Sequence, residues 1–449
     1  MRRVGEEEPH LEHERSAESS HAGIVVERAP PVPMKVLSGE LRSGIPLYVV
    51  EDVAPAFVSS VVCCLRFGAR HDPPRRGGIT HFLEHLLLRD RPDRPSFTRR
   101  INELGGEANG LTSKEELAIY ARVPSDSLAQ ALTAAADCLT ARELPLDELE
   151  LERSVILEEL EQAQGDPSDA IHDLAYESVF GRHTLARPPG GSLESVRAIG
   201  APDILQLREE RVHAGTIAIC VAGGASLAEV SSLLDTTPLG EVGGNGWLPS
   251  AEPPPDLRAL DASAPPQLRS IRSDYAFVAL ALPGFSYSDP REAAADVIGM
   301  LVAGSTSSLL YREVRERRGL AYALGGWHRP YTDTGFFRTT IGLTPQRASE
   351  VIEVSLETIA QQVAAGWTEA EVEIGKRQVV GEALLGLESS ADSALAVART
   401  RFVGDVEGWT PLEYTRTVAA LTAGEVNELA ADWLGDGLVT SGIGGFDGA

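Results

Sequence analysis

The chain has 449 residues, and its 66 acidic and 40 basic side chains leave a formal net charge of −26. This negative charge argues against a nucleic-acid-binding protein, which would normally carry a basic face, and against docking on an anionic membrane. A hydrophobic content of 43% with 24% charged residues is typical of a folded protein. No apolar run approaches the ~18 residues that span a bilayer. The length favours about two or three domains.

The N-terminal segment differs in character from the rest of the chain. Residues 1–23 are polar and acidic and contain no apolar stretch of the kind found in a signal peptide. We expect residues 1–33 to form a disordered tail and assign no metal-binding role to its histidines. The chain contains four cysteines, Cys63, Cys64, Cys138 and Cys220. They show no C-x-x-C pairing, which favours buried, reduced thiols in a cytoplasmic protein.

The pattern of strands and linkers predicts two domains. Alternating residues from Met34 predict a β-hairpin with a glycine-containing turn, and residues 57–66 predict a further strand. Glycine and proline are dense between residues 236 and 268, which indicates a linker. We therefore expect a first domain at residues 34–235 and a second domain at residues 269–449.

The two halves repeat one order of elements: strand, helix, strand, strand, helix. The strand at 57–66 precedes a predicted helix from about Gly78, and the strand at 275–283 precedes a helical region at 290–318. Each half continues with a Gly-Gly turn, an alternating strand and an amphipathic helix. The repeat predicts an α+β fold of two homologous domains, each an antiparallel β-sheet covered on one face by helices.

The most specific motif is H-F-L-E-H, which runs from His81 to His85 in a predicted helix. Residues four apart share a helix face, so both imidazoles can reach one ion, and Glu84 lies close to that face. Neutral imidazole is a good zinc ligand, and a nearby carboxylate can act as a general base. The spacing is the inverted form of H-E-x-x-H and predicts a zinc site. The alternative is a partly exposed helix with incidental histidines.

A catalytic zinc site takes a third protein ligand and keeps one position open for water. The acid-rich segment at 144–166 is rich in helix formers and can supply a carboxylate, although most of its acids fit a solvated face. Glu152 and Glu159 lie two helical turns apart, on one side of the helix. The periodicity does not choose between Glu158 and Glu159 as the ligand.

The motif followed by Glu159 resembles the inverted-zinc-motif peptidases of the pitrilysin and insulysin family, which includes the mitochondrial processing peptidases. GGITHFLEH resembles the zinc helix of that family, and LGGEANGLTSKEELAIY at 104–120 resembles its G-G-x-x-N-A-x-T-S segment. The segment at 152–183 resembles its ligand helix. The resemblance extends over roughly residues 34–440 in both halves.

The resemblance implies a role for each matching residue. The zinc ligands would be His81, His85 and Glu159. Glu84 would be the base that deprotonates zinc-bound water, and Glu152 would be a carboxylate that orients a ligand. Asn109 matches an asparagine near the substrate backbone, with an Asx turn after Gly105-Gly106 as the alternative.

The second half adds a further match. The segment at 305–326 resembles a family segment in which an arginine and a tyrosine, here Arg315 and Tyr322, face the zinc across a chamber. Tyrosine can donate a hydrogen bond to the oxyanion, and arginine can hold a peptide carbonyl or carboxylate. The alternative for Arg315 is an exposed basic helix end. The chain departs from the family at residues 88–91, where F-K-G-T is frequent, and at Leu309, where the family has arginine.

The sequence therefore predicts a zinc-dependent metalloendopeptidase with one Zn²⁺ per chain, which hydrolyses small unfolded or precursor peptides in a closed chamber. Family members of this length resemble half of the longer pitrilysin-type chain, so a homodimer is expected, or a heterodimer with a homologous subunit. We expect no nucleic-acid or membrane partner and a cytoplasmic location. The alternatives are a non-catalytic structural or assembly subunit of a heterodimeric peptidase, and a purely structural metal.

Overall fold

The computed structural model describes residues 34–51, 57–90, 95–141, 144–244, 248–249, 265–435 and 437–446. The predicted tail at 1–33 and much of the predicted linker at 236–268 lie outside these residues. Within the described residues, no helix combines the length and the apolar character needed to cross a membrane.

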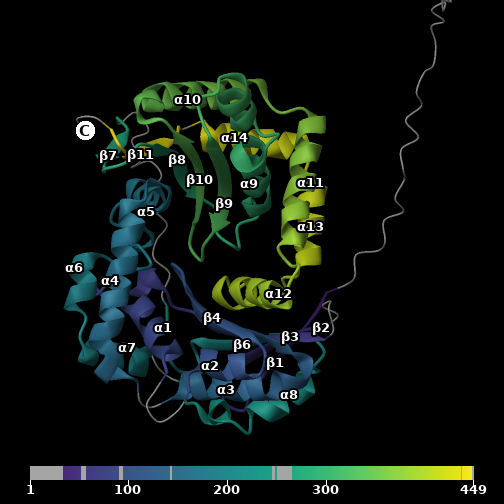
Figure 1. Cartoon of the computed structure of the whole chain (residues 1–449). Coiled ribbons are helices and arrows are strands. Elements are labelled where there is room, and N and C mark those ends of the chain that lie inside the picture. Colours follow the sequence, from purple (N-terminus) through teal and green to yellow (C-terminus); the bar gives the residue numbers. More distant parts are fainter. Residues whose placement is uncertain are drawn as a thin grey trace, which may run out of the picture. The chain divides into compact units, whose positions relative to one another are not determined.

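The first half forms a six-stranded sheet in the order β1-β2-β6-β3-β5-β4 (Figure 1). Its strands are β1 (Lys35–Glu40), β2 (Pro46–Glu51), β3 (Val58–Leu65), β4 (Glu107–Thr112), β5 (Leu117–Pro124) and β6 (Ile217–Ala222). Its helices are α1 (Ile79–Leu88), α2 (Phe97–Glu103), α3 (Leu128–Thr140), α4 (Leu149–Gly165), α5 (Pro167–Phe180), α6 (Leu193–Ala198), α7 (Ala201–Arg211) and α8 (Leu227–Leu234). β4 lies at the open edge of this sheet.

The second half forms a five-stranded sheet in the order β7-β11-β8-β10-β9. Its strands are β7 (Gln267–Ser270), β8 (Ala276–Gly284), β9 (Ala323–Pro330), β10 (Gly335–Leu343) and β11 (Val439–Gly444). Its helices are α9 (Glu292–Gly299), α10 (Ala348–Ala365), α11 (Glu369–Leu385), α12 (Ser390–Val397), α13 (Pro411–Ala420) and α14 (Ala423–Leu434). Three π-helical segments, Met300–Gly304, Tyr311–Arg317 and Ala398–Val403, complete it.

The predicted α+β class is confirmed, because β3, α1, β4, β5 and α3 are matched in order by β8, α9, β9, β10 and α10. Three details differ from the sequence prediction. Each sheet contains one parallel pair, β2 with β6 and β7 with β11. Gly325 and Gly326 lie inside β9 rather than in a turn. At the ends of the predicted linker, Pro238–Glu241 forms a 3₁₀ helix with Leu239 buried, and β7 already begins at Gln267.

Helices cover both faces of each sheet, so the prediction of one covered face was wrong. One face of the first sheet packs against helices of its own half, among them α1 and α3. Its other face packs against α12 from the second half, whereas α5 from the first half packs against β8 and β11 of the second sheet (Figure 1). β3 and β6 are accordingly apolar on both sides apart from Ser59 and Ser60, as expected for strands that are buried on both faces.

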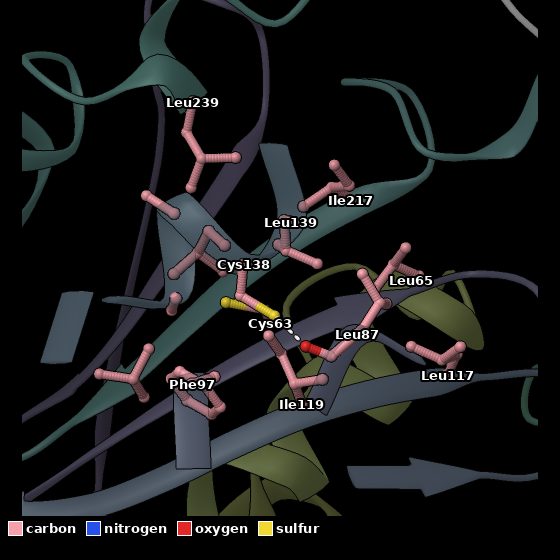
Figure 2. Packing of buried hydrophobic residues seen from close by; sticks show 14 of the residues in the cluster. Cys63, Leu65, Leu87, Phe97, Leu117, Ile119, Cys138, Leu139, Ile217 and Leu239 are labelled. Carbon is pink, nitrogen blue, oxygen red and sulfur yellow. Dashed lines mark hydrogen bonds between the residues drawn. The ribbon is translucent and has the colours of Figure 1, made fainter. Parts of the chain in front are cut away.

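The hydrophobic core of the first half packs against the apolar side of α1. Phe82, Leu83 and Leu86 of α1 are completely buried in this core. Figure 2 shows Cys63 of β3 beside Cys138 of α3, whose thiol donates to the backbone oxygen of Leu87 at 3.4 Å. Neither cysteine forms a disulfide, both are buried, and burial raises the pKa of the Cys63 thiol. These thiols therefore act as packing groups that link the sheet, α3 and α1.

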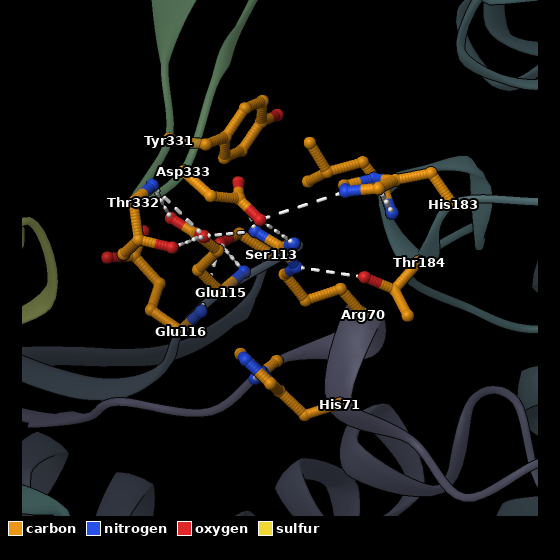
Figure 3. Close-up of polar contacts among 12 residues, drawn as sticks. Arg70, His71, Ser113, Glu115, Glu116, His183, Thr184, Tyr331, Thr332 and Asp333 are labelled. Carbon is orange, nitrogen blue, oxygen red and sulfur yellow. Dashed lines mark hydrogen bonds and ion pairs between the residues drawn. The ribbon is translucent and has the colours of Figure 1, made fainter. Parts of the chain in front are cut away.

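The two halves also meet through a buried polar junction within one compact unit, Pro33–Ala449. Arg70, shortly before α1, forms ion pairs with Glu115 (2.6 Å) and with Asp333 of the β9–β10 turn (2.5 Å), and all three side chains are buried (Figure 3). Glu115 also accepts hydrogen bonds from the backbone and hydroxyl of Thr332. His183 lies 3.7 Å from the same Asp333 carboxylate. The β4–β5 turn of the first sheet and the β9–β10 turn of the second sheet thus both contact the guanidinium of Arg70.

We expect Asp333→Ala to lower the free energy of unfolding by about 3 kcal/mol, because it removes one of the two carboxylates that balance a buried charge. Glu350→Ala breaks the exposed Glu350–Arg347 pair and serves as the matched control, with a cost of about 0.5 kcal/mol. Denaturant titration of both variants measures the difference. Equal costs would contradict a structural role for the junction.

Candidate metal centre

The helix that carries the H-F-L-E-H motif begins at a tightly fixed point. Gly78 precedes α1 with a φ of 87°, a conformation that favours glycine, and a Cβ there would collide with the backbone of Gly190. The buried carboxylate of Asp72 accepts hydrogen bonds from the Gly78 amide at 2.7 Å and from the Thr80 hydroxyl at 2.5 Å. With its apolar side in the core, α1 is held in one rotation about its axis. This rotation directs His81 and His85 toward α4.

The structure brings His81, His85 and Glu159 together. One ligand atom from each lies within 4.8 Å of the others, and this is the only such group of His, Cys, Asp and Glu among the described residues. The two imidazole Nε2 atoms are 3.3 Å apart, and a Glu159 carboxylate oxygen is 3.7 Å from that of His85. Glu158 is exposed and lies outside the group. The geometry thus distinguishes two neighbouring glutamates that the helical period leaves equivalent.

Glu152 holds the orientation of His85. Its carboxylate is 4% exposed and lies 3.1 Å from His85 Nδ1. An ionised carboxylate only accepts, so the imidazole carries its proton on Nδ1 and directs the Nε2 lone pair toward His81 and Glu159. The other Glu152 oxygen pairs with Arg89 at 2.7 Å, and Arg89 also pairs with Glu148. Arg89 belongs to the segment in which the sequence departs from the family.

The donor set suits a zinc ion. Burial, with a smaller contribution from His85, lowers the pKa of His81 to about 4, so its imidazole is neutral at neutral pH. Two neutral imidazoles and one carboxylate, with a water in the fourth position, form a typical catalytic zinc site. The Nε2 atoms of His81 and His85 face each other, so a cation between them would bind both lone pairs.

Glu84 lies beside the three candidate ligands, between α1 and β4. It is 8% exposed, and the hydroxyl of Thr112 donates a hydrogen bond to its Oε2. Burial raises the pKa of this carboxyl, while the Thr112 hydrogen bond and His85 oppose the rise. A Cβ on Gly110 would collide with Oε1 of Glu84, so the close approach of β4 requires glycine here. No sequence pattern predicts these contacts, although Gly110 and Thr112 lie in the 104–120 segment that resembles the family.

Asn109 faces the same site. It lines a solvent-open hollow of about 430 Å³ together with residues of α1, of α4 and of the position just after α1, namely His81, Glu84, His85, Leu88, Arg89, Glu152 and Glu159. Asn109 lies in β4 opposite Tyr120, and its side-chain oxygen accepts from the Gly110 amide at 2.9 Å. Its position within a strand excludes the turn that was the alternative interpretation.

Arg315 and Tyr322 are placed elsewhere, since neither is among the described residues that line the hollow. The Arg315 guanidinium lies 4.8 Å from the centre of the Tyr311 ring. Tyr322 is 51% exposed and packs edge-to-face on Phe277 of β8. Burial raises the pKa of Tyr322, as do Tyr275 and Asp166 to a smaller extent. Asp166 directly follows α4, the helix that carries Glu159.

A two-domain α+β fold with an H-x-x-E-H helix and a third ligand on a separate helix defines an inverted-motif metallopeptidase fold. Residues 48–191 match the family model described as Insulinase (Peptidase family M16), and residues 198–379 match the Peptidase M16 inactive domain. An uncharacterized zinc protease of Mycobacterium leprae is 30% identical over 405 residues, which cover 88% of this chain and 89% of that protein. The chain therefore belongs to peptidase family M16.

Other relatives and solved structures agree on family and fold. An uncharacterized zinc protease of Streptomyces coelicolor is 29% identical over 395 residues, which cover 87% of this chain and 85% of that protein. A peptidase M16 inactive domain from Pseudomonas fluorescens has a TM-score of 0.81 at 18% identity, covering 92% of this chain and 98% of that chain. A chain of complex III from Candida albicans has a TM-score of 0.75 at 16% identity, covering 91% and 96%. The solved structures establish the fold alone.

We expect Glu159→Gln to reduce zinc occupancy strongly, because a neutral amide replaces the charged ligand, whereas Glu158→Gln should keep about one zinc per chain. Glu152→Gln should weaken zinc binding by roughly 10–100-fold, since it acts through His85. Metal analysis after dialysis, with chelator competition for affinity, measures all three variants. Loss of zinc in the Glu158 variant instead would show that the ligand register is shifted by one residue.

Proposed function

We propose that the chain is a zinc-dependent endopeptidase that hydrolyses small unfolded or precursor peptides. The observation that carries this proposal is the convergence of His81, His85 and Glu159 beside the buried carboxylate of Glu84. A zinc ion held by these ligands supplies a Lewis acid for the scissile carbonyl and lowers the pKa of its water to ~7. Two bacterial relatives are named uncharacterized zinc proteases, and these names support the same proposal.

Glu84 is the proposed general base. Thr112 holds Oε2, which leaves Oε1 to accept the proton of the attacking water and return it to the leaving amine. Proton transfer by a positioned side chain contributes ~10²–10⁴ in rate. A base works best when its pKa lies near the working pH, and the raised pKa of Glu84 moves it in that direction.

The edge strand β4 supports an extended peptide as the substrate. One side of β4 pairs with β5, and the other side has no strand partner among the described residues. Free backbone groups on an edge strand can pair with an added peptide strand. A peptide aligned along β4 would pass Asn109 and the hollow that contains the ligands. Only an unfolded segment can adopt this conformation, which favours unfolded or precursor peptides over folded proteins.

Two further features are proposed from the sequence resemblance. Two chains would close around the peptide as a homodimer, with a heterodimer as the alternative. Arg315 and Tyr322 would then contact the substrate from the second half, Tyr322 as a hydrogen-bond donor to the oxyanion. The exposure of Tyr322 leaves its hydroxyl free for such a contact. A cytoplasmic location remains a prediction.

Glu84→Gln should abolish peptide hydrolysis and leave zinc near one per chain, because Glu84 acts on the water and is not a ligand. Turnover of a quenched fluorescent peptide library, with metal analysis of the same samples, measures both properties. Near wild-type turnover in the variant would refute the mechanism. A wild-type chain that binds zinc but cleaves nothing would favour the structural or assembly subunit, a role compatible with the likeness to a chain of complex III.

Mixing Glu84→Gln chains with Tyr322→Phe chains tests whether sites are shared between subunits. Each variant alone should be impaired, the Tyr322 variant by roughly 10²-fold if it supplies an oxyanion donor. If a site combines residues from two chains, mixed dimers regain about one intact site, and turnover rises above that of either variant. If mixing restores nothing, each chain builds its own site. Full activity of Tyr322→Phe alone would remove Tyr322 from the mechanism.

A further inference from the structure

A strip on the second sheet carries side chains that the proposed reaction does not use. Arg338 of β10 lies directly opposite Trp327 of β9, and Thr340 lies opposite Gly325. Opposed residues, and residues two apart along a strand, point to the same face of a sheet. These four residues therefore share one face at the open edge of the sheet, where β9 is the outermost strand.

Arg338 is a buried cation for which the described part of the chain supplies no counter-charge. The residue is 4% exposed, and its Nη1 is buried without a hydrogen-bond partner among the residues that the structure describes. No carboxylate among the described residues forms an ion pair with it, and burial alone lowers its pKa to about 10. A buried charge is costly unless it is paired and hydrogen-bonded. The Arg338 guanidinium is thus a buried hydrogen-bond donor whose Nη1 has no acceptor among the described residues.

Trp327 contacts only the flat face of the Arg338 guanidinium. The Arg338 Cζ atom lies 4.6 Å from the centre of the indole ring, within the range of a cation–π contact. Such a contact engages only the face of the guanidinium, and Nη1 at its edge has no acceptor among the described residues. Trp327 is itself 37% exposed, and a Cβ on Gly325 would meet no atom within 4 Å. The indole and the strand beside it at Gly325 are therefore accessible to an incoming group, next to the buried guanidinium.

The same strip leads toward Tyr322. Gly342 lies four residues beyond Arg338 on β10, and a Cβ there would meet the rings of Tyr322 and Phe277. Four residues of a strand span about 13 Å, which is the length of about four residues of extended peptide. The strip thus has an aromatic group at each end, with Gly325 and Thr340 between them.

We propose that Arg338 and Trp327 form a carboxylate-binding subsite for the peptide substrate. The planar fork of arginine matches a carboxylate, with which it forms two parallel hydrogen bonds, and the indole ring covers one side of the pair. The carboxylate is either the C-terminus of the peptide or an Asp or Glu side chain. This subsite rests on the proposed peptidase function and deepens it by selecting acidic or short, free-ended peptides.

Binding to non-cleaving chains tests the subsite without dependence on turnover. Labelled peptides of equal length carry a C-terminal acid, a C-terminal amide, or an amide with one internal Glu or Gln. Their Kd values are measured by fluorescence anisotropy on zinc-loaded Glu84→Gln chains, with and without Arg338→Gln. We expect Arg338 to favour the acid over the amide, or the Glu over the Gln peptide, by about 10-fold. The pair that shows the preference identifies the source of the carboxylate.

Matched variants separate recognition from structure. Arg338→Gln should remove the preference and leave the affinity for neutral peptides unchanged, whereas Arg338→Lys should restore it in part, because the charge remains without the fork. Arg347→Gln, at an exposed arginine of the same half, should keep the full preference. In cleaving chains Arg338→Gln should raise KM for the preferred peptide and leave kcat within about twofold.

The possible outcomes distinguish the subsite from the proposed function. A carboxylate preference that depends on Arg338, in a chain that cleaves no peptide, would support the subsite and refute the peptidase. Cleavage without such a preference would overturn the subsite and leave the peptidase standing. Equal weakening of all peptides by Arg338→Gln, together with a lower melting temperature, would assign the arginine a structural role only and also overturn the subsite.

Discussion

The geometry of the site depends on the contact between α1 and α4 at the buried carboxylate of Glu152. This carboxylate accepts from His85 Nδ1 and pairs with Arg89, the residue directly after α1. It fixes the tautomer of the imidazole and the rotation of one helix against the other. Since Glu159 lies two turns further along α4, the same contact sets its distance from both histidines. Asp72 fixes the other end of α1.

A second constraint on the site is that each half packs one helix against the sheet of the other half. α5 continues directly from α4 and packs on the second sheet, and α12 packs on the first sheet. The helix that carries Glu159 is thereby tied to both halves. The Arg70 junction joins the two hairpin turns at another point, close to the start of α1. The zinc ligands are therefore positioned by the packing of the whole compact unit rather than by one domain.

The sequence predicted the local part of this arrangement well. His81, Glu84 and His85 share a face because of the helical period alone, and the repeated order of elements identified two similar α+β domains. The choice of Glu159 over Glu158 needed the family resemblance, because both fit the helix. The exchange of α5 and α12 was not predictable, since an amphipathic pattern shows that a face is buried but not which sheet buries it.

The contacts that support the metal site could not be predicted from the sequence pattern for a similar reason. Asp72, Gly110 and Thr112 act across 6 to 28 residues of sequence, through hydrogen bonds and close approaches that exist only in the folded chain. Arg338 gave no signal, because a single arginine in an alternating strand is ordinary. Its burial without a carboxylate becomes visible only when the sheet and its neighbours are assembled.

X-ray absorption at the zinc edge of the metal-loaded chain tests the central claim most directly, because it reports the ligand atoms without dependence on activity. The account predicts two imidazole nitrogens with oxygen ligands from Glu159 and water, all at about 2.0–2.2 Å. It also predicts that the imidazole signature persists in Glu84→Gln. Sulfur scattering at about 2.3 Å, or a site without two imidazoles, would contradict the assignment of His81, His85 and Glu159.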